Sequence, residues 1–332
     1  MRSPFTALCL LLSATLANDL FAHEVPPALP EAVQEIYPAV YKNKIWVAGG
    51  ISSTLPAEQG NMTAKVHFWS TEEKQWQQAP SLPEGRHHTY LQAAAGKLFA
   101  FGGFINSAQG QWLNTADVLL LDETKNTWIK VAELPIPLSE TVGTVIKGKI
   151  HLAGGRSPQK NQNGQWQHST DTAAHFVFNP TDYTFTHAKP LPTPRNSAAT
   201  VTSKHGWIVI GGRQMGGSNL SEVLLYNAKL DTWQPLAHLP EPRAGHAATI
   251  INESIYVFGG EHHSGVYQNI LKYDLKTDAW HSISKWPAAL HGLGSVTLNG
   301  TPWLIGGARH SGLANTSNAL LDANKVITPQ KL

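Results

Sequence analysis

The sequence predicts an all-β fold in which one four-stranded antiparallel sheet is repeated six times and closes into a six-bladed β-propeller. Three observations predict it. Glycine pairs recur at intervals of 47 to 57 residues, each pair ends an apolar run, and an aromatic residue follows a later apolar run at a fixed offset. Such a period is typical of a repeat architecture that forms one domain. The glycine pairs are Gly49-Gly50, Gly102-Gly103, Gly154-Gly155, Gly211-Gly212, Gly259-Gly260 and Gly306-Gly307.

Each repeat contains four short apolar runs, which we predict as the four antiparallel strands of one blade. In five repeats an Asp, Asn or Ser stands six residues before an aromatic residue, and a Leu-Pro or Trp-Pro begins six residues after it. In the second repeat these positions are Asp122, Trp128 and Leu134. We expect the glycine pair to mark a strand end without room for a Cβ, and the aromatic residue to pack between blades.

Closure of the ring depends on the two ends of the repeat array. The sixth repeat has a third strand, SNALLD, but no Trp six residues after Asp322. The missing outer strand must come from the C-terminal KVITPQKL or from residues 23–28. We favour the C-terminal segment because it is longer and less rich in proline, which cannot donate a ladder hydrogen bond.

The first 22 residues have the pattern of a secretory signal peptide. Arg2 is a short positive region, residues 5–17 are an apolar stretch too short to span a bilayer, and Ala22 is a small residue before His23. We therefore expect a signal peptide at 1–22 and an exported, monomeric propeller domain at 23–332. The one cysteine, Cys9, lies in the apolar stretch, so the mature chain would contain no disulfide and no thiolate metal site.

The charge balance narrows the class of partner. The chain has 25 Lys and Arg residues against 23 Asp and Glu residues, without basic runs. This balance argues against nucleic acid or a membrane surface as the partner. Because the net charge is close to zero, any electrostatic function must depend on where individual charged residues gather. We also expect no metal and no cofactor.

Two turns of each repeat should lie at the same end of the central channel. In a meander, the turn after the glycine pair and the turn carrying Leu-Pro open on the same face. The Arg-His-His cluster at residues 86–88 lies in the second of these turns, and two later repeats also place an arginine there. In the sixth repeat the equivalent residue is Leu290 or His291. The predicted ligand-binding residues around this end are Arg86, Arg156, Arg195, Arg213, Arg243, His291 and Arg309.

These residues predict a positive funnel that holds one acid, Glu261, and suits an anionic ligand. Guanidinium groups pair well with a carboxylate, and aromatic residues of the loops suit a sugar ring. A purely structural role also fits the arginines that follow the proline, because they could hydrogen-bond carbonyl groups of the neighbouring blade. The polar stretch 156–173 could form a wall of the same site.

The repeat, with its double glycine and later Trp, resembles the kelch repeat over essentially the whole mature chain, which implies a kelch-type β-propeller. Six such repeats behind an export signal, ending in SNALLDANK, resemble the bacterial N-acetylneuraminate epimerases, mutarotases that interconvert the anomers of sialic acid. The resemblance implies a periplasmic protein that acts on a carboxylated sugar. That family assigns catalysis to a Glu directly after the fourth glycine pair and an Arg six residues later, where this chain has Arg213 and Asn219.

We predict Glu261 and His262 as the catalytic residues of such an isomerase, since mutarotation requires a base for the anomeric hydroxyl and an acid for the ring oxygen. A non-catalytic module that binds glycan or protein remains the alternative. A copper enzyme like galactose oxidase is excluded because it needs a cysteine in the mature chain. A sialidase is excluded because the sequence lacks S-x-D-x-G-x-T-W boxes.

Overall fold

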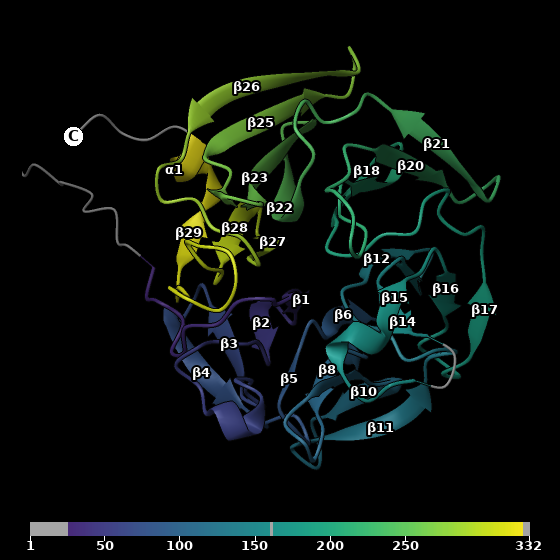
Figure 1. Cartoon of the computed structure of the whole chain (residues 1–332), viewed down its shortest axis with the longest axis vertical. Helices are drawn as coiled ribbons and strands as arrows, with labels where there is room; N and C mark the ends of the chain where they lie inside the picture. The colour runs from purple at the N-terminus through teal and green to yellow at the C-terminus, as the bar shows by residue number, and fades with distance from the viewer. Residues whose placement is uncertain (1–25, 160–161, 328–332) are drawn as a thin grey trace, which may run out of the picture.

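Short strands that alternate with tight turns pair with their neighbours in sequence, and this gives antiparallel meanders. The computed structural model of the protein describes residues 26–159 and 162–327. In this part of the chain six meanders stand around a central axis, as the blades of a β-propeller (Figure 1). The predicted all-β propeller is confirmed. The predicted signal peptide lies outside the described residues, and no helix within them is long and apolar enough to cross a membrane.

The strands of the blades follow chain order. The first three sheets contain β1 (Ala39–Tyr41), β2 (Lys44–Ala48), β3 (Val66–Ser70) and β4 (Gln75–Ala79); β6 (Tyr90–Ala94), β7 (Lys97–Phe101), β10 (Asp117–Asp122) and β11 (Thr127–Glu133); β12 (Val142–Ile146), β13 (Lys149–Ala153), β16 (His175–Phe178) and β17 (Phe185–His187). The last three contain β18 (Ala199–Ser203), β19 (Gly206–Ile210), β20 (Val223–Asn227) and β21 (Thr232–Leu236); β22 (Ala244–Ile251), β23 (Ser254–His262), β25 (Asn269–Asp274) and β26 (Ala279–Lys285); β27 (Gly294–Leu298), β28 (Thr301–Ile305) and β29 (Leu320–Asp322).

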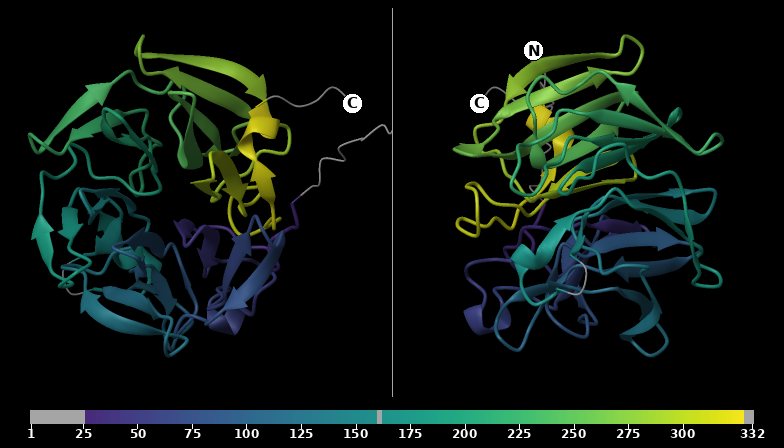
Figure 2. Two further views of the ribbon diagram at one scale, coloured as in Figure 1. Left: turned by 180° about the vertical axis from the view of Figure 1, so that it is seen from behind. Right: turned by 45° about the vertical axis from the view of Figure 1, so that its right-hand side comes forward.

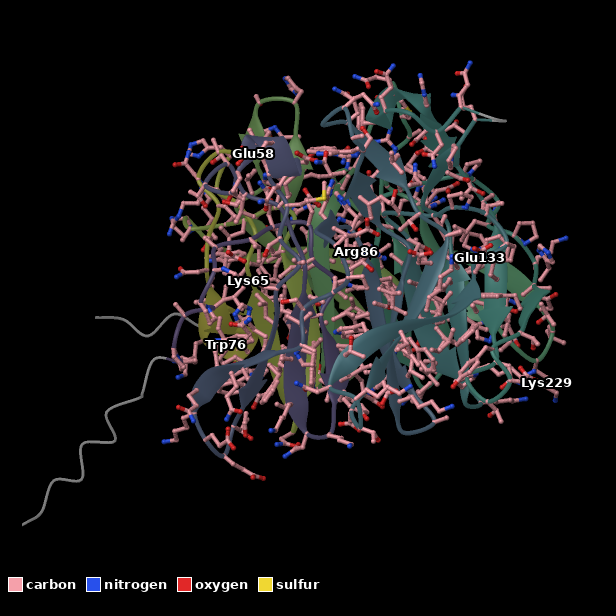
Figure 3. The ribbon with its side chains drawn as sticks, turned by 90° about the horizontal axis from the view of Figure 1, so that it is seen from below. Glu58, Lys65, Trp76, Arg86, Glu133 and Lys229 are labelled. Atoms are coloured by element: carbon pink, nitrogen blue, oxygen red, sulfur yellow. The ribbon has the colours of Figure 1, made fainter. Side chains whose placement is uncertain are left out.

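Smaller elements follow the glycine pairs or, for β5, the turn with Leu82-Pro83, and they form one end of the propeller, which we call the mouth (Figure 2). Viewed edge-on, Glu58 lies at the mouth and Lys229, in the turn between β20 and β21, lies toward the opposite end (Figure 3). The mouth elements are η1 (Ala57–Gln59), β5 (Arg86–His87), β8 (Phe104–Asn106), β9 (Trp112–Asn114), β14 (Arg156–Pro158), η2 (Trp166–His168), β15 (Ser169–Asp171) and β24 (Gly265–Val266).

The innermost strand of each blade contacts the next one around the axis, and the contact between β27 and β1 completes the circle. The glycine pairs make a second circle of contacts. The N–H of the second glycine donates to a carbonyl of the next blade, as from Gly103 to Leu138 (2.8 Å) and from Gly260 to Leu290 (3.0 Å). The bond from Gly307 to Val33 (2.9 Å) joins the sixth blade to the first.

The first glycine of each pair has no room for a side chain, as the sequence predicted. Gly259 has φ +62°, and a Cβ there would overlap the carbonyl oxygen of Leu290. Because only glycine tolerates both the left-handed backbone and this approach, the pair fixes the spacing between blades.

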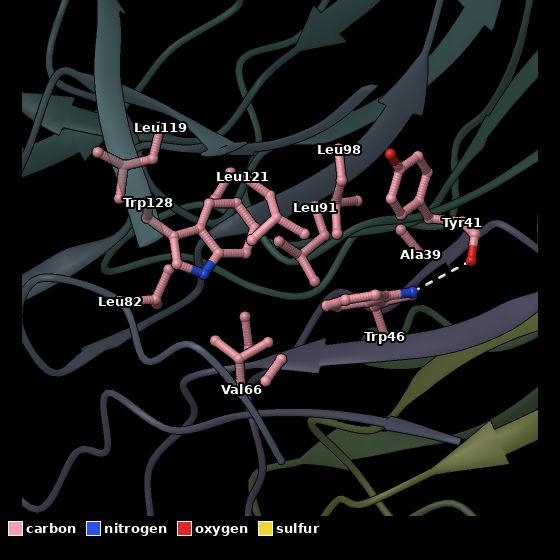
Figure 4. Packing of buried hydrophobic residues seen from close by; sticks show 13 residues of the cluster. Ala39, Tyr41, Trp46, Val66, Leu82, Leu91, Leu98, Leu119, Leu121 and Trp128 are labelled. Carbon is pink, nitrogen blue, oxygen red and sulfur yellow. Dashed lines mark hydrogen bonds between the residues drawn. The ribbon is translucent and has the colours of Figure 1, made fainter. Parts of the chain in front are cut away.

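Apolar side chains fill the space between neighbouring blades. Figure 4 shows the cluster between the first two sheets, where Trp46, Val66, Leu98 and Trp128 pack together. The indole N–H of Trp128 donates to the carbonyl of Pro80 at 2.9 Å, in the segment that joins those two blades. The predicted role of the repeated Trp, packing between blades, is confirmed.

The predicted closing strand is wrong within the described residues. Lys325, Val326 and Ile327 of the C-terminal segment belong to the helix α1 (Ala323–Ile327), because Asp322 accepts a hydrogen bond from the backbone N–H of Asn324 (2.9 Å) as an N-cap does. The sixth sheet therefore has three strands in the described part of the chain. The N-terminal segment contacts this blade instead, through the bond from the Leu29 N–H to the Asn318 carbonyl (2.8 Å).

Candidate functional site

The two turns predicted to share one face do meet at the mouth. Antiparallel pairing places Asn196 beside Arg213 and Ala244 beside Glu261. In each pair the first residue follows the turn that carries Leu-Pro, and the second follows a glycine pair. The expectation that both turns open at one end of the channel is therefore confirmed.

One residue further along, each blade places a left-handed residue next to the axis. The φ angles of these six residues lie between 50° and 61°, and we call them the inner ring: Glu35, His88, Glu140, Ser197, Gly245 and Gly292. Backbone hydrogen bonds join members of neighbouring blades, for example from the His88 N–H to the Glu35 carbonyl (2.9 Å) and from the Gly292 N–H to the Gly245 carbonyl (2.8 Å). Left-handed backbone is strained in residues other than glycine, and such strain concentrates at functional sites.

A cavity of about 190 Å³ lies against the inner ring. Its walls combine carboxylates and imidazoles with the indoles of Trp112 and Trp166. A groove of about 550 Å³ lies beside it, lined among others by Asn219, His262 and Tyr267. The cavity and the groove share two residues, Arg213 and Glu261, which therefore stand where one space meets the other.

Acidic and basic side chains alternate around the cavity. His88 Nε2 lies 2.8 Å from the Glu35 carboxylate, and Arg213 pairs with Glu261 and lies 3.6 Å from Glu140. His291 Nδ1 stands between two acids, 3.8 Å from Glu35 and 3.7 Å from Glu261. A second guanidinium, Arg156, reaches Glu140 at 3.4 Å. The predicted positive funnel with one acid is thus corrected to a charge-balanced site with three carboxylates.

The buried groups keep their charges because each has an opposite partner. Burial disfavours the charged forms, but His88 lowers the pKa of both Glu35 and Glu140, and Arg213 lowers them further. The pKa of His88 is raised, since Glu35 and Glu140 outweigh its burial. The pKa of Arg213 is raised in the same way by Glu140 and Glu261.

Three of the predicted ligand-binding arginines lie outside both the cavity and the groove. The guanidinium groups of Arg86, Arg195 and Arg243 are buried and donate to the carbonyls of Gly102 (3.2 Å), Gly211 (3.0 Å) and Gly259 (3.1 Å) in the same relative position. Each also pairs with an acid, Glu84, Glu222 or Glu241. The arginines therefore have a structural role, as the sequence allowed, but the carbonyls belong to their own blades and not to the neighbouring ones. The proposals below do not use these arginines.

The other predicted residues occupy different parts of the mouth. Arg156 is buried against the ring of Trp166, 3.9 Å from its centroid, and Arg309 is exposed. His262 lies in the groove beside Tyr267, with ring centroids 4.7 Å apart and the ring planes tilted by 59°. His291 lines the cavity, and its Nε2 bonds the His310 carbonyl (2.6 Å). The glycine-pair bond identifies Leu290, not His291, as the sixth equivalent of the arginine position.

Sequence reasoning missed Glu35, His88 and Glu140. The sequence did contain a signal for these residues. Each stands two residues after the arginine position of its repeat, and at the same position the last two repeats have glycine. A position that is glycine in some repeats and ionisable in others indicates a left-handed turn with a side chain placed for function. Comparing this register between repeats would have identified the inner ring.

Comparisons with known proteins agree with this architecture. The model of the Attractin/LZTR1 beta-propeller family matches residues 45–316. Mouse Kelch-like protein 35 is 25% identical over 240 residues, covering 72% of this chain and 37% of that protein, and the Kelch-like protein terF of Aspergillus terreus is 24% identical over 234 residues, covering 69% and 50%. Beta-scruin of Limulus polyphemus is 28% identical over 160 residues, covering 48% and 17%. The chain thus spans half or less of the length of these relatives.

A solved structure resembles the whole propeller. The structure of YjhT superposes with a TM-score of 0.77 and covers 90% of this chain and 96% of its own, with 18% sequence identity. At this level of identity the likeness shows the fold alone.

Proposed function

We propose that this chain, which belongs to the Attractin/LZTR1 β-propeller family, binds a carboxylated sugar such as sialic acid at the mouth of its central channel. The observation that carries the proposal is that the cavity and the groove share Arg213 and Glu261. Ligand sites usually measure about 300–1,000 Å³ and combine aromatic walls with a few polar groups, and the groove with its adjoining cavity fits that description.

The residues of the mouth supply the contacts that such a ligand requires. Arg213 is the member of the charged cluster best placed for an anion, because 28% of its side chain is exposed. The indoles of Trp112 and Trp166 offer faces for a sugar ring, and Asn219 and Tyr267 offer hydrogen-bonding groups along the groove. Glu35 and Glu140 add acceptors for sugar hydroxyl groups.

We propose further that the bound sugar undergoes mutarotation, with Glu261 as the base. Glu261 takes the proton of the anomeric hydroxyl, an acid protonates the ring oxygen, and the ring carbon–oxygen bond breaks to give the open-chain ketone. Rotation about the carbon chain and reclosure on the other face, with the protons returned, give the other anomer. Positioned acid and base groups contribute about 10²–10⁴-fold to such a step.

NMR spectroscopy of sialic acid freshly dissolved as one anomer tests this function. We expect the protein to accelerate equilibration, and Glu261→Gln to lower the acceleration about 10²–10⁴-fold. Glu133→Gln, a matched change 67% exposed on an outer strand, should leave it unchanged. Ligand-induced shifts of protein resonances without acceleration would favour the non-catalytic binding module. No interaction with sialic acid would contradict the proposed ligand.

We also propose that the protein acts in the periplasm as a monomer, since residues 1–22 have the pattern of a signal peptide. The secreted protein should begin near His23 on N-terminal sequencing. Recovery of a chain that still begins at Met1 from the cytoplasm would contradict export.

A further inference from the structure

We infer that His87 is the acid of this site, the group that donates a proton to the ligand in the cavity, and that Glu35 and His88 hold it in the donating form. The inference rests on the proposed function for the identity of the ligand. It concerns a residue that the charged cluster does not include, and it identifies the acid that mutarotation needs beside Glu261.

Three side chains lie in a row, and its last member, His87, lines the cavity. The Glu35 carboxylate lies 2.8 Å from Nε2 of His88, and Nδ1 of His88 lies 2.7 Å from Nδ1 of His87. The remaining nitrogen, Nε2 of His87, is buried and has no hydrogen-bond partner in residues 26–159 and 162–327. This part of the chain has further buried polar atoms without a partner, but His87 is one of the few that also line the cavity, which points to a group kept for something bound there.

The proton positions follow from the partners. Nε2 of His88 faces a carboxylate, which only accepts, so this nitrogen carries a hydrogen. A charged His88 also carries a hydrogen on Nδ1, which it donates to Nδ1 of His87. His87 then accepts at Nδ1, and as a neutral imidazole it must carry its own hydrogen on Nε2. The unpartnered nitrogen of this cavity-lining residue is therefore an N–H donor.

The electrostatics of the two rings support this assignment. Burial lowers the pKa of His87, and the neighbouring His88 lowers it further, so His87 is neutral. The pKa of His88 is raised, because Glu35 and Glu140 outweigh its burial. One imidazolium next to one neutral imidazole fits the short Nδ1–Nδ1 contact, whereas two charged rings would repel each other.

Packing holds the His87 ring in place. The strand β5 pairs His87 with Phe104 of β8, and the two rings stack with centroids 5.1 Å apart. The ring of Trp112 meets His87 edge-on at 4.4 Å, and all three lie in one short sheet. His87 and Trp112 both line the cavity, so a sugar placed on this indole comes within reach of the imidazole.

The proton transfer balances within this row. The Nε2–H bond of His87 breaks as the ligand ring oxygen gains that proton, and Nδ1 of His87 takes the Nδ1 proton of His88. His88 is left neutral, and its Nε2–H still lies beside the Glu35 carboxylate. The positive charge of His88 is thus delivered to the ligand, while the reverse transfers restore the site when the ring closes.

Nitrogen-15 NMR of the histidine rings tests the row without any ligand. We expect His88 to show two protonated nitrogens near neutral pH, and His87 to show a protonated Nε2 with a bare Nδ1. The variants His87→Phe and His88→Asn assign the signals, and the buried neutral His246, whose pKa burial lowers to about 3, serves as an internal reference. A His87 with its proton on Nδ1, or a neutral His88, would overturn the inference.

Kinetics then test the use of the donor. His87→Phe keeps an aromatic ring between Phe104 and Trp112 but removes the N–H, and it should lower the acceleration of sialic acid mutarotation about 10²-fold or more while circular dichroism stays native. His281→Phe, an exposed position, is the matched control. Full activity of His87→Phe would overturn the acid role. If NMR shows the predicted protonation of His87 and His88 but the protein does not accelerate mutarotation of sialic acid, the proposed function is wrong, whereas the proton positions in these two rings are confirmed.

Discussion

Arg243 and Arg213 lie at the same end of the propeller, yet their surroundings differ. Arg243 is buried and donates to the backbone carbonyls of Gly259 (3.1 Å) and Asn269 (3.0 Å) in its own blade. Arg213 is partly exposed and pairs with the carboxylates of Glu140 and Glu261, which come from two other blades. The first arginine holds a blade in place, whereas the second forms part of a wall around a cavity.

The difference shows that positions kept the same in several repeats serve packing, whereas positions that vary between repeats can serve function. Arg243 has equivalents at Arg86 and Arg195, each of which donates to the carbonyl of the first glycine of its own repeat's pair, so that position is repeated for a structural reason. The position of Arg213 changes from repeat to repeat, through Ile51, Phe104, Arg156 and Glu261. Packing between similar blades does not require such variation, whereas a site assembled from different blades does.

The largest effect should come from the most uniform position. Gly259→Ala places a methyl group against the Leu290 carbonyl in left-handed backbone, and we expect it to lower the free energy of unfolding by more than about 4 kcal/mol. Gly96→Ala has the same backbone strain (φ +70°) but open space, so about 1 kcal/mol is expected. Denaturant titration measures both, and equal losses would show that the glycine pair does not set the blade spacing.

Removal of the buried Arg243 should have an intermediate effect. Arg243→Met leaves two carbonyl groups without their donor, and at about 1–3 kcal/mol for each unpaired buried group we expect a loss of roughly 3 kcal/mol. The exposed Arg309→Met should change the free energy of unfolding by less than about 0.5 kcal/mol. If Arg243→Met lowered sialic acid affinity without lowering stability, the structural assignment of this arginine would be wrong.

The smallest effect should come from the mouth, as a change in pH dependence. The pKa of His88 is raised in the folded protein, so its stabilising charge is fully present below its unfolded pKa of about 6.5 and is lost as the pH rises through the folded value. His88→Asn keeps a residue that tolerates left-handed backbone but removes the charge. The stability advantage of the wild type over this variant, measured by denaturation from pH 5 to 9, should therefore shrink with rising pH. An advantage that stays constant would contradict a charged His88.

Much of the fold could be predicted from the sequence because local chemistry repeats. Gly259 and its equivalents mark a strand end in left-handed backbone, and Trp128 and its equivalents mark a contact between blades. Because each pattern recurs in several repeats, each of these two predictions is supported several times within one chain. Ring closure had no such repetition. Whether Lys325 continued a strand or a helix depended on a single cap at Asp322, and this prediction was wrong.

The sequence by itself determined the propeller, the end at which the variable residues gather, and the presence of Arg213, Glu261 and His291 there. Only the tertiary structure decided which ionisable groups meet, because their contacts join residues from different blades. Glu35 reaches His88 across the first two blades, and Glu140 is far from Arg213 in sequence but 3.6 Å away in space. The charge of a site is the sum over such neighbours, so single positions predicted a positive funnel where the folded chain has balanced acids and bases.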